Sequence, residues 1–202
     1  MTSTTLPVRL PMTPTRAFGH IMAATNKAAY QAALGSLAPC ENASILEIGF
    51  GAGALLQLAL KRWPTCKVAG IDPTPAMVEM AASRRALKRA ADKVTLKCAG
   101  AEDLPFAAEM FDAVVAVNSF QFWSPPERAM DEITRVMKDG AQIVLVLRAH
   151  GQHAPDWLPN PISRSGAEAE GARALMQAHG FTDTRVSIAG RDIEVVSGRK
   201  ML

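Results

Sequence analysis

The stretch Glu47-Ile48-Gly49-Phe50-Gly51-Ala52-Gly53 lies between a short apolar run at 45–48 and a helical pattern at 54–63. Glycines at this spacing permit a tight turn and let the backbone approach a ligand closely. The helix that follows presents free N–H groups and the positive end of its dipole. Asp72 ends the next apolar run, 23 positions after Gly49, where an acid can accept hydrogen bonds from a ribose diol. The pattern therefore predicts a site for a cofactor that contains a nucleoside.

Outward from this turn, short apolar runs alternate with longer helical patterns. The predicted strands are 45–48, 67–71, 94–98, 111–117 and 142–147, and the predicted helices are 54–63, 75–91, 126–137 and 167–178. Gly140 is expected to end the third of these helices as a C-cap. Strands at 186–188 and 193–196 lie too close together for a helical crossover and must pair as an antiparallel hairpin. We expect an α/β fold, with a Rossmann-like, doubly wound, mostly parallel seven-stranded sheet, a C-terminal antiparallel hairpin strand and helices on both faces.

Composition restricts the class of protein. The chain has 202 residues, of which 49% are apolar and 20% charged, which excludes intrinsic disorder and a fibre. No apolar run approaches the roughly 18 residues of a membrane span. The net charge of +3 is too mild to indicate nucleic acid. Three cysteines without a CxxC pair suit a reducing cytosol. We therefore expect a cytoplasmic protein without stable membrane insertion, as a monomer or a homodimer.

The first 40 residues contain no acidic side chain. We expect residues 1–40 to form a flexible N-terminal arm and a capping helix (16–37), in front of a catalytic domain at 41–202. An acid-free start that carries arginines is also typical of organelle transit peptides. Pro7, Pro11 and Pro14 break any early amphipathic helix, which favours the flexible arm over a targeting role.

The spacing alone leaves two cofactor classes open. Gly49-x-Gly51-x-x-Ala54 also satisfies the dinucleotide fingerprint, so a nicotinamide cofactor remains an alternative. Glu47 favours a different ligand, because a carboxylate before the glycines repels a pyrophosphate but can bind an ammonium group. Glu102, after the third predicted strand, adds an acid that can accept a hydrogen bond from an adenine amino group. The closing hairpin is also not part of the simple doubly wound order.

With these motifs in this order, the sequence resembles the class I S-adenosylmethionine (SAM)-dependent methyltransferases. The matching stretches are ILEIGFGAGALLQLAL, VAGIDPTPAMVEMA, GAEDLPF, FDAVVAVNSFQFW and ITRVMKDGAQIVLVLR, which span about residues 44–148. Overall the chain is similar to small methyltransferases related to the ubiquinone/menaquinone-biosynthesis C-methyltransferase family. Those enzymes carry a longer insertion after the fifth strand, and residues 118–123 depart from their pattern, which argues against a quinone acceptor.

The resemblance implies a set of cofactor-binding residues. Glu47, Gly49, Gly51 and Gly53 would hold the methionine part of SAM, Asp72 the ribose hydroxyls, and Ala101 (backbone) and Glu102 (side chain) the adenine, with Met77 packed against it. Asn118 and Ser119 would line the methyl-transfer site. S-adenosylhomocysteine is the implied product, and in-line transfer from a sulfonium requires no metal.

Residues on the acceptor side follow from the same region. Three aromatic residues are expected at the substrate, where their ring faces can stabilise a sulfonium cation: Phe120, Phe122 and Trp123. Packing in the core or in a lid is an equal alternative for them. His20, His150 and His153 are candidate bases, and surface histidines are the alternative for each. The basic residues Arg84, Arg85, Lys88, Arg89 and Lys93 are expected to form a solvated helix face rather than a nucleic-acid site.

The sequence thus predicts a SAM-dependent methyltransferase that acts on a small-molecule acceptor, lipid-like acceptors included. A nicotinamide-dependent oxidoreductase is one alternative, although the only tyrosine, Tyr30, lies before the fold and forms no Tyr-x-x-x-Lys pair. A catalytically silent SAM-binding protein is the other. The residues do not distinguish carbon, nitrogen, oxygen and sulfur acceptors.

Overall fold

The computed structural model describes residues 25–148, 166–190 and 192–202. The strands are β1 (Ser44–Ile48), β2 (Lys67–Asp72), β3 (Val94–Cys98), β4 (Phe111–Val117), β5 (Met137–Arg148), β6 (Phe181–Gly190) and β7 (Ile193–Lys200). The helices are α2 (Lys27–Ser36), α3 (Ala54–Arg62), α4 (Pro75–Ser83), α5 (Arg85–Arg89), α6 (Pro126–Val136) and α7 (Gly166–Ala178), with 3₁₀ turns η1 (Ala91–Lys93) and η2 (Phe120–Phe122).

The seven strands form one sheet in the order β3-β2-β1-β4-β5-β7-β6. Strands β1 to β5 pair in parallel, and β7 pairs antiparallel with both β5 and β6. The predicted mostly parallel sheet with an antiparallel hairpin is therefore confirmed. The strand order reverses between β1 and β4, and in open α/β sheets ligands bind at the carboxyl ends of the strands at such a switch point.

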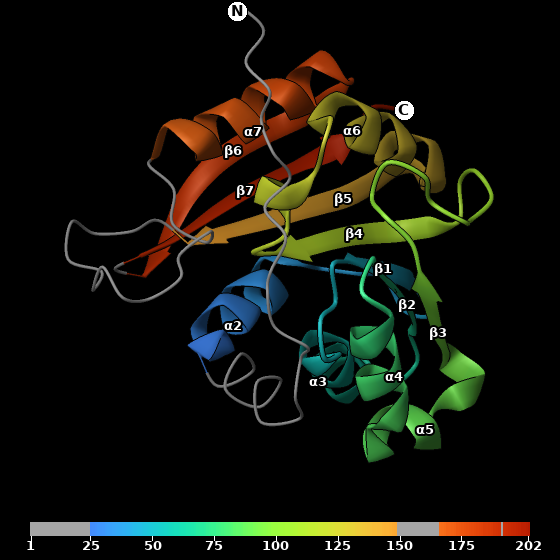
Figure 1. Cartoon of the computed structure of the whole chain (residues 1–202). Helices are drawn as coiled ribbons and strands as arrows, with labels where there is room; N and C mark the ends of the chain where they lie inside the picture. The colour runs from blue at the N-terminus through green and yellow to red at the C-terminus, as the bar shows by residue number, and fades with distance from the viewer. Residues whose placement is uncertain (1–24, 149–165, 191) are drawn as a thin grey trace, which may run out of the picture.

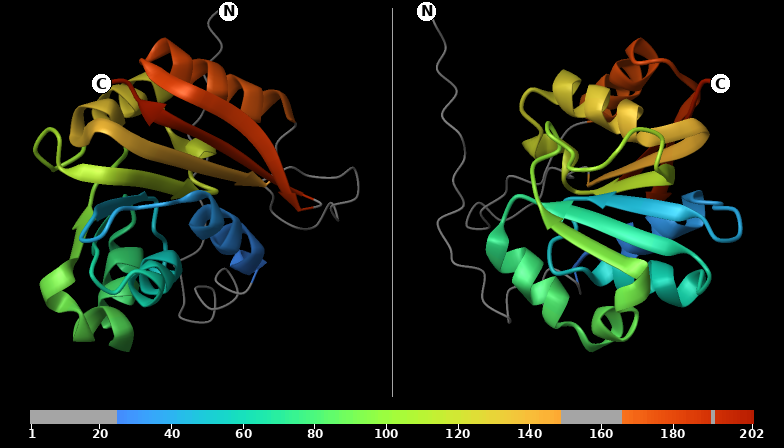
Figure 2. Two further views of the ribbon diagram at one scale, coloured as in Figure 1. Left: turned by 180° about the vertical axis from the view of Figure 1, so that it is seen from behind. Right: turned by 90° about the vertical axis from the view of Figure 1, so that its right-hand side faces the viewer.

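Helices cover both faces of the sheet (Figure 1). Helices α6 and α7 lie on one face and α2, α3, α4 and α5 on the other, and Figure 2 shows α7 running along β6 and β7. Each face has its own apolar core. Successive strand side chains point to opposite faces, so on β1 Leu46 and Ile48 belong to the core under α6 and α7, while Ile45 belongs to the other core. Glu47 therefore points toward the α2 and α3 face.

Two predicted helix boundaries are wrong. The helix expected over 126–137 ends at Val136, and Gly140 lies inside β5 rather than at a C-cap. Met137 already pairs with Phe111 of β4, so the chain passes from α6 directly into the sheet. The helix expected over 75–91 is interrupted at Arg84, whose backbone is extended (φ −64°, ψ 125°). Both helix boundaries depend on residues that are distant in sequence: Met137 pairs with Phe111, and Arg84 contacts Ala52.

Helix α2 is the described part of the helix predicted over 16–37, and it packs on the sheet. Ala29, Tyr30, Ala33 and Leu34 are its buried side chains. Its C-terminal end is held by Gln142 of β5, which donates through Nε2 to the carbonyl of Ser36 at 2.7 Å and accepts from the Ala38 N–H at 3.1 Å. The arm expected before it lies outside the described residues. None of the described helices is long and apolar enough to cross a bilayer.

Candidate cofactor site

The turn between β1 and α3 is held against β2 by its backbone. The Gly49 N–H donates to the carbonyl of Ile71 at 2.8 Å. Gly49, Gly51 and Gly53 have φ values of 75, 52 and 74°, a region that side chains disfavour. A Cβ on Gly49 would lie 2.5 Å from the Cβ of Ser119, whereas one on Gly51 would meet no described atom within 4 Å. Gly51 therefore presents its backbone to open space, where a ligand can approach it.

Asp72 stabilises this turn from the end of β2. Its Oδ2 accepts the Gly51 N–H and its Oδ1 accepts the Thr74 N–H, both at 2.9 Å. The side chain is 7% exposed, and burial raises the pKa of its carboxyl group above the ordinary value. Each carboxylate oxygen has a second lone pair. Asp72 can therefore hold the turn and accept hydrogen bonds from a diol at the same time.

Glu47 is more deeply buried than Asp72 at this edge. It is 2% exposed, and its Oε2 has no hydrogen-bond partner among the described residues. The carboxyl group accepts the backbone N–H of Leu56 in α3. Burial, and to a lesser degree the charge of Asp72, raise its pKa from 4.5 to about 8. A buried oxygen without a partner is costly, so a ligand that brings a cationic donor to it would supply the missing interaction.

Arg84 also supports the turn, which sequence reasoning did not predict. Its Nε donates to the carbonyl of Ala52, inside the glycine stretch, and its Nη1 donates to Gln57 Oε1 at 3.3 Å. The expectation that the whole basic run is a solvated helix face is therefore wrong for Arg84. Arg84 lies at the break between α4 and α5. The pattern of apolar residues does not reveal such a break, so the contact could not be predicted from it.

Two polar residues of the N-terminal region join the same cluster. Asn26 is buried, and its Oδ1 accepts from Asn118 Nδ2 at 3.1 Å. The Tyr30 hydroxyl is hydrogen-bonded to the Asn26 side chain, and burial, followed by the charge of Glu47, raises the Tyr30 pKa to about 12. An Asn before a helix is typical of an N-cap, but the Asn26 side chain makes no capping hydrogen bond. It instead connects α2 to the end of β4.

Asn118 and Ser119 follow β4, as the sequence predicts. Asn118 is 9% exposed with φ 51°, and its Oδ1 has no partner among the described residues. The Ser119 hydroxyl donates to the carbonyl of Ile48 at 2.8 Å, which draws the β4 end against β1. The polar groups of Glu47, Asn118 and Ser119 thus gather where the strand order reverses.

The three aromatic residues after Asn118 have different surroundings. Trp123 is buried in the core under α6 and α7, and Phe120 packs against that core and meets the Trp123 ring edge-on at 5.2 Å between centroids. Phe122 is 48% exposed. Trp123 and Phe120 therefore pack in or against the core in this structure, as the alternative interpretation expected. Of the three rings, Phe122 is the exposed one.

The residues expected at an adenine lie at the ends of β2 and β3. Ala101 is buried and Glu102 is half-buried. The Glu102 carboxylate folds back over Gly100, where an added Cβ would lie 2.3 Å from its Oε1. Met77 is half-buried in the first turn of α4. The Glu102 carboxylate makes no hydrogen bond to the described residues, so it is available as an acceptor.

The candidate bases His20, His150 and His153 lie outside the described residues. Over residues 25–148, 166–190 and 192–202 there is no group of three or more His, Cys, Asp or Glu side chains that could hold a metal ion. The described cysteines, Cys40, Cys66 and Cys98, are all free thiols. The polar groups that the described residues bring to the turn are carboxylates, amides and backbone N–H and C=O groups.

The arrangement fits a nucleoside cofactor with a cationic end better than a dinucleotide. Asp72 and Glu102 are carboxylate acceptors after the neighbouring strands β2 and β3, and Gly51 leaves room beside the backbone. Glu47 Oε2 has no hydrogen-bond partner over the described ranges, so a cationic donor can bind it. A pyrophosphate brought to the same turn would meet the buried carboxyl groups of Glu47 and Asp72, and a second negative charge there is unfavourable.

Comparison with known proteins identifies methyltransferases as relatives of this chain. Residues 46–145 match a protein family described as a methyltransferase domain. The uncharacterized methyltransferase YdaC of Bacillus subtilis is 33% identical over 130 residues, which are 64% of this chain and 70% of that protein. The erythromycin 3''-O-methyltransferase of Saccharopolyspora erythraea is 30% identical over 164 residues, 72% of this chain and 53% of that protein.

Solved structures share the fold. A SAM-dependent methyltransferase from Aquifex aeolicus superposes with a TM-score of 0.76 at 20% identity, covering 93% of this chain and 98% of that one. At that identity the likeness concerns the architecture alone.

Proposed function

The chain belongs to the methyltransferase-domain family and is a SAM-dependent methyltransferase, and on that premise we propose that it methylates a small-molecule acceptor at the carboxyl ends of β1 and β4. One observation carries the proposal: the buried Glu47 Oε2 has no hydrogen-bond partner among the described residues, and it lies next to a glycine turn with open space at Gly51. SAM carries an ammonium group that can meet this oxygen. The small-molecule acceptor is supported by the name of the erythromycin 3''-O-methyltransferase relative.

Each part of the cofactor has a candidate partner. Glu47 would bind the ammonium, the Gly51 backbone would lie along the methionine chain, and Asp72 would accept from the ribose hydroxyls. The adenine would receive the Ala101 N–H and donate its amino group to the Glu102 carboxylate. Met77, from the first turn of α4, would pack on the base.

When bound, SAM supplies a methyl group already activated on a sulfonium. Alignment is the main contribution left to the protein, and it can supply roughly 7–11 kcal/mol of the barrier. Asn118 is suited to align the acceptor, because its Nδ2 donates to Asn26 while its Oδ1 has no partner in the described part of the chain. Phe122, four residues later in the chain, offers an exposed ring. His20, His150 and His153 remain the proposed bases, and a base would add about 10²–10⁴-fold where the acceptor must lose a proton.

The decisive experiment is calorimetric titration of the full chain with SAM, S-adenosylhomocysteine and NAD in parallel. We expect both sulfur compounds to bind and NAD not to bind. Binding of NAD alone would overturn the proposal in favour of a nicotinamide-dependent oxidoreductase. A second step incubates the protein with methyl-labelled SAM and fractionated small-molecule extract, and label in a small molecule is the expected result. Binding without any transfer would favour a silent SAM-binding protein.

Replacing Asp72 with alanine should weaken S-adenosylhomocysteine binding at least tenfold, because it removes the acceptors for the ribose. It should also cost about 1–3 kcal/mol of stability, since the N–H groups of Gly51 and Thr74 lose their partner. Calorimetry and urea unfolding measure the two effects. Asp92→Ala, at a residue in η1 that is exposed, is the matched control. Unchanged affinity in Asp72→Ala would remove Asp72 from the ribose site.

A further inference from the structure

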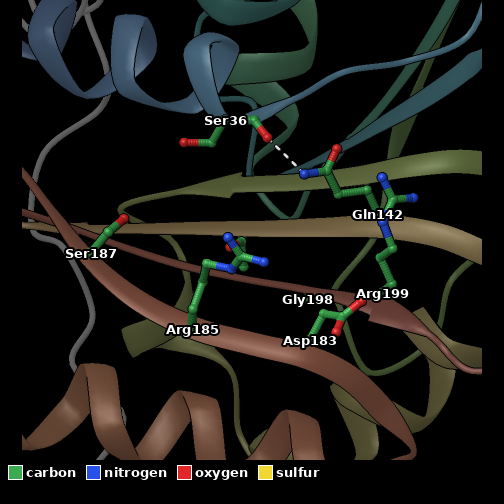
Figure 3. A pocket seen from close by; sticks show the side chains of 8 residues that line it. Ser36, Gln142, Asp183, Arg185, Ser187, Gly198 and Arg199 are labelled. Atoms are coloured by element: carbon green, nitrogen blue, oxygen red, sulfur yellow. Dashed lines mark hydrogen bonds between the residues drawn. The ribbon is translucent and has the colours of Figure 1, made fainter.

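A polar hollow of about 280 Å³ lies between the C-terminal end of α2 and the strands β5, β6 and β7. Figure 3 shows its lining, in which side chains from the three strands rise toward Ser36 of α2. The lining residues are Ser36, Gln142, Asp183, Arg185, Ser187, Ser197, Gly198 and Arg199. Its volume is near the lower end of small-molecule sites, which hold about 300–1,000 Å³.

The hollow is separate from the cofactor site. Helix α2 begins beside Asn26, which is hydrogen-bonded to Asn118 at the carboxyl edge, and ends at Ser36, which lines the hollow. Ten residues of α-helix separate the two places by about 15 Å. Gln142 is the sixth of the twelve residues of β5, whereas the cofactor edge is reached at the far end of that parallel strand. A ligand in the hollow would therefore leave the cofactor site free.

Two guanidinium groups dominate the charge of the hollow. Arg185 of β6 pairs across the strands with Ser197 of β7, and Arg199 lies two residues further along β7, so the two arginines are diagonal neighbours on one face. Arg199 donates through Nη1 to the carbonyl of Gly140 at 3.1 Å. Arg185 is exposed and makes no hydrogen bond or ion pair with the described part of the chain. Its five N–H donors are available to a ligand.

The remaining groups indicate which ligand fits. Ser36, Ser187 and Ser197 offer hydroxyl donors, and the wall has no large apolar side chain. Asp183 is the only carboxylate in the lining. With the two arginines, the lining side chains therefore carry a net charge of +1. Asp183 makes no ion pair with either arginine. Paired guanidinium groups with hydroxyl donors are the usual partners of phosphate oxygens.

We propose that this hollow binds a phosphate group, either as inorganic phosphate or as the phosphomonoester of a small metabolite. Arg185 supplies the charge and the forked donors, Arg199 supplies a second guanidinium, and the serine hydroxyls complete the shell. Asp183 opposes the anion and sets its affinity in a moderate range. The site is additional to methyl transfer and does not use the cofactor residues.

The test follows backbone amide shifts of the ¹⁵N-labelled full chain during titration with inorganic phosphate and, separately, glycerol 3-phosphate, at constant ionic strength. Saturable shifts confined to residues 142, 183–187 and 197–199 are expected in at least one titration. Tighter binding of glycerol 3-phosphate assigns the site to a phosphomonoester, and tighter binding of inorganic phosphate assigns it to the free ion. Saturating S-adenosylhomocysteine should leave the phosphate affinity unchanged.

Three variants sharpen the result. Arg185→Gln should weaken phosphate binding about tenfold or more without loss of stability, because Arg185 has no described partner to lose. Asp183→Asn should strengthen it roughly two- to fivefold. Arg85→Gln removes the same charge from an exposed position on α5 and should leave binding unchanged. Shifts that never saturate, equal affinity in Arg185→Gln and Arg85→Gln, or displacement of phosphate by S-adenosylhomocysteine would each overturn the proposal.

Discussion

Replacing Glu47 with glutamine should weaken S-adenosylhomocysteine binding at least tenfold, yet make the ligand-free protein more stable at pH 8. The binding loss is expected because the buried Oε2, which lacks a described partner, is where the ligand's ammonium would bind, and hydrogen bonds between charged groups contribute about 1.5–3 kcal/mol. The gain in stability is expected because glutamine keeps the shape and removes a carboxyl group that resists ionisation in its buried position.

The pH dependence follows from the Glu47 pKa, which rises from 4.5 to about 8 on burial. Between these values the folded chain holds a proton that the unfolded chain has lost, so the free energy of unfolding falls as pH rises. The loss from this group is on the order of a few kcal/mol by pH 8, at about 1.36 kcal/mol per pKa unit. Ligand affinity should change in the opposite direction, rising toward pH 8, because the ammonium group favours the ionised carboxylate.

Urea unfolding and calorimetry from pH 5 to 8 measure both effects. The native chain should lose stability and gain affinity across this range, and Glu47→Gln should flatten both profiles. Glu79→Gln, at an exposed position on α4, is the matched control and should follow the native chain. If Glu47→Gln kept the native pH profiles, Glu47 would be neither the perturbed carboxyl group nor the ammonium partner.

Replacing Gly51 with arginine should abolish S-adenosylhomocysteine binding, a loss of a hundredfold or more, while the protein stays folded. A side chain on Gly51 would enter the open space beside the turn, where the ligand is expected to lie. The cost to the fold is limited to the positive φ of 52°, about 1–2 kcal/mol for a residue with a Cβ.

Gly180→Arg provides a matched control, because Gly180 also has positive φ (81°) and open space around it but follows α7, away from the turn. Both variants should lose similar stability in urea unfolding, and only Gly51→Arg should lose binding in calorimetry. Near-native affinity in Gly51→Arg would mean that the ligand does not approach the turn from the side that Gly51 leaves open.

Much of the architecture was predictable because its signals are local. The apolar runs and the turns between them identified the strands, and the short connection before Ile193 required an antiparallel hairpin. The wrong predictions concern helix boundaries that are set by contacts with residues distant in sequence. Gly140 resembled a C-cap, but pairing of Met137 with Phe111 starts the strand earlier. The helical pattern over 75–91 concealed a break at Arg84, whose side chain reaches Ala52.

The cofactor site divides in the same way. The glycine turn and Asp72 stand next to predicted strands, so their place at the carboxyl edge follows from sequence alone. Asn26 meets Asn118 across 92 positions, and no spacing rule predicts that contact. Likewise, the aromatic residues at 120–123 do not by their order predict that Trp123 is buried in the core while Phe122 is exposed. The phosphate hollow collects side chains from α2, β5, β6 and β7.

Local sequence patterns were enough to predict the strands, the antiparallel hairpin and the glycine turn, because periodicity and turn chemistry act over a few residues. The strand order, with its reversal between β1 and β4, is known from the folded sheet. The electrostatic state of the site, in contrast, arises from three-dimensional packing. Glu47 is an ordinary acid in the sequence, and its pKa reaches about 8 because the packed sheet and helices exclude water and bring Asp72 near. Desolvation belongs to the assembled fold, since it depends on every element that covers the side chain.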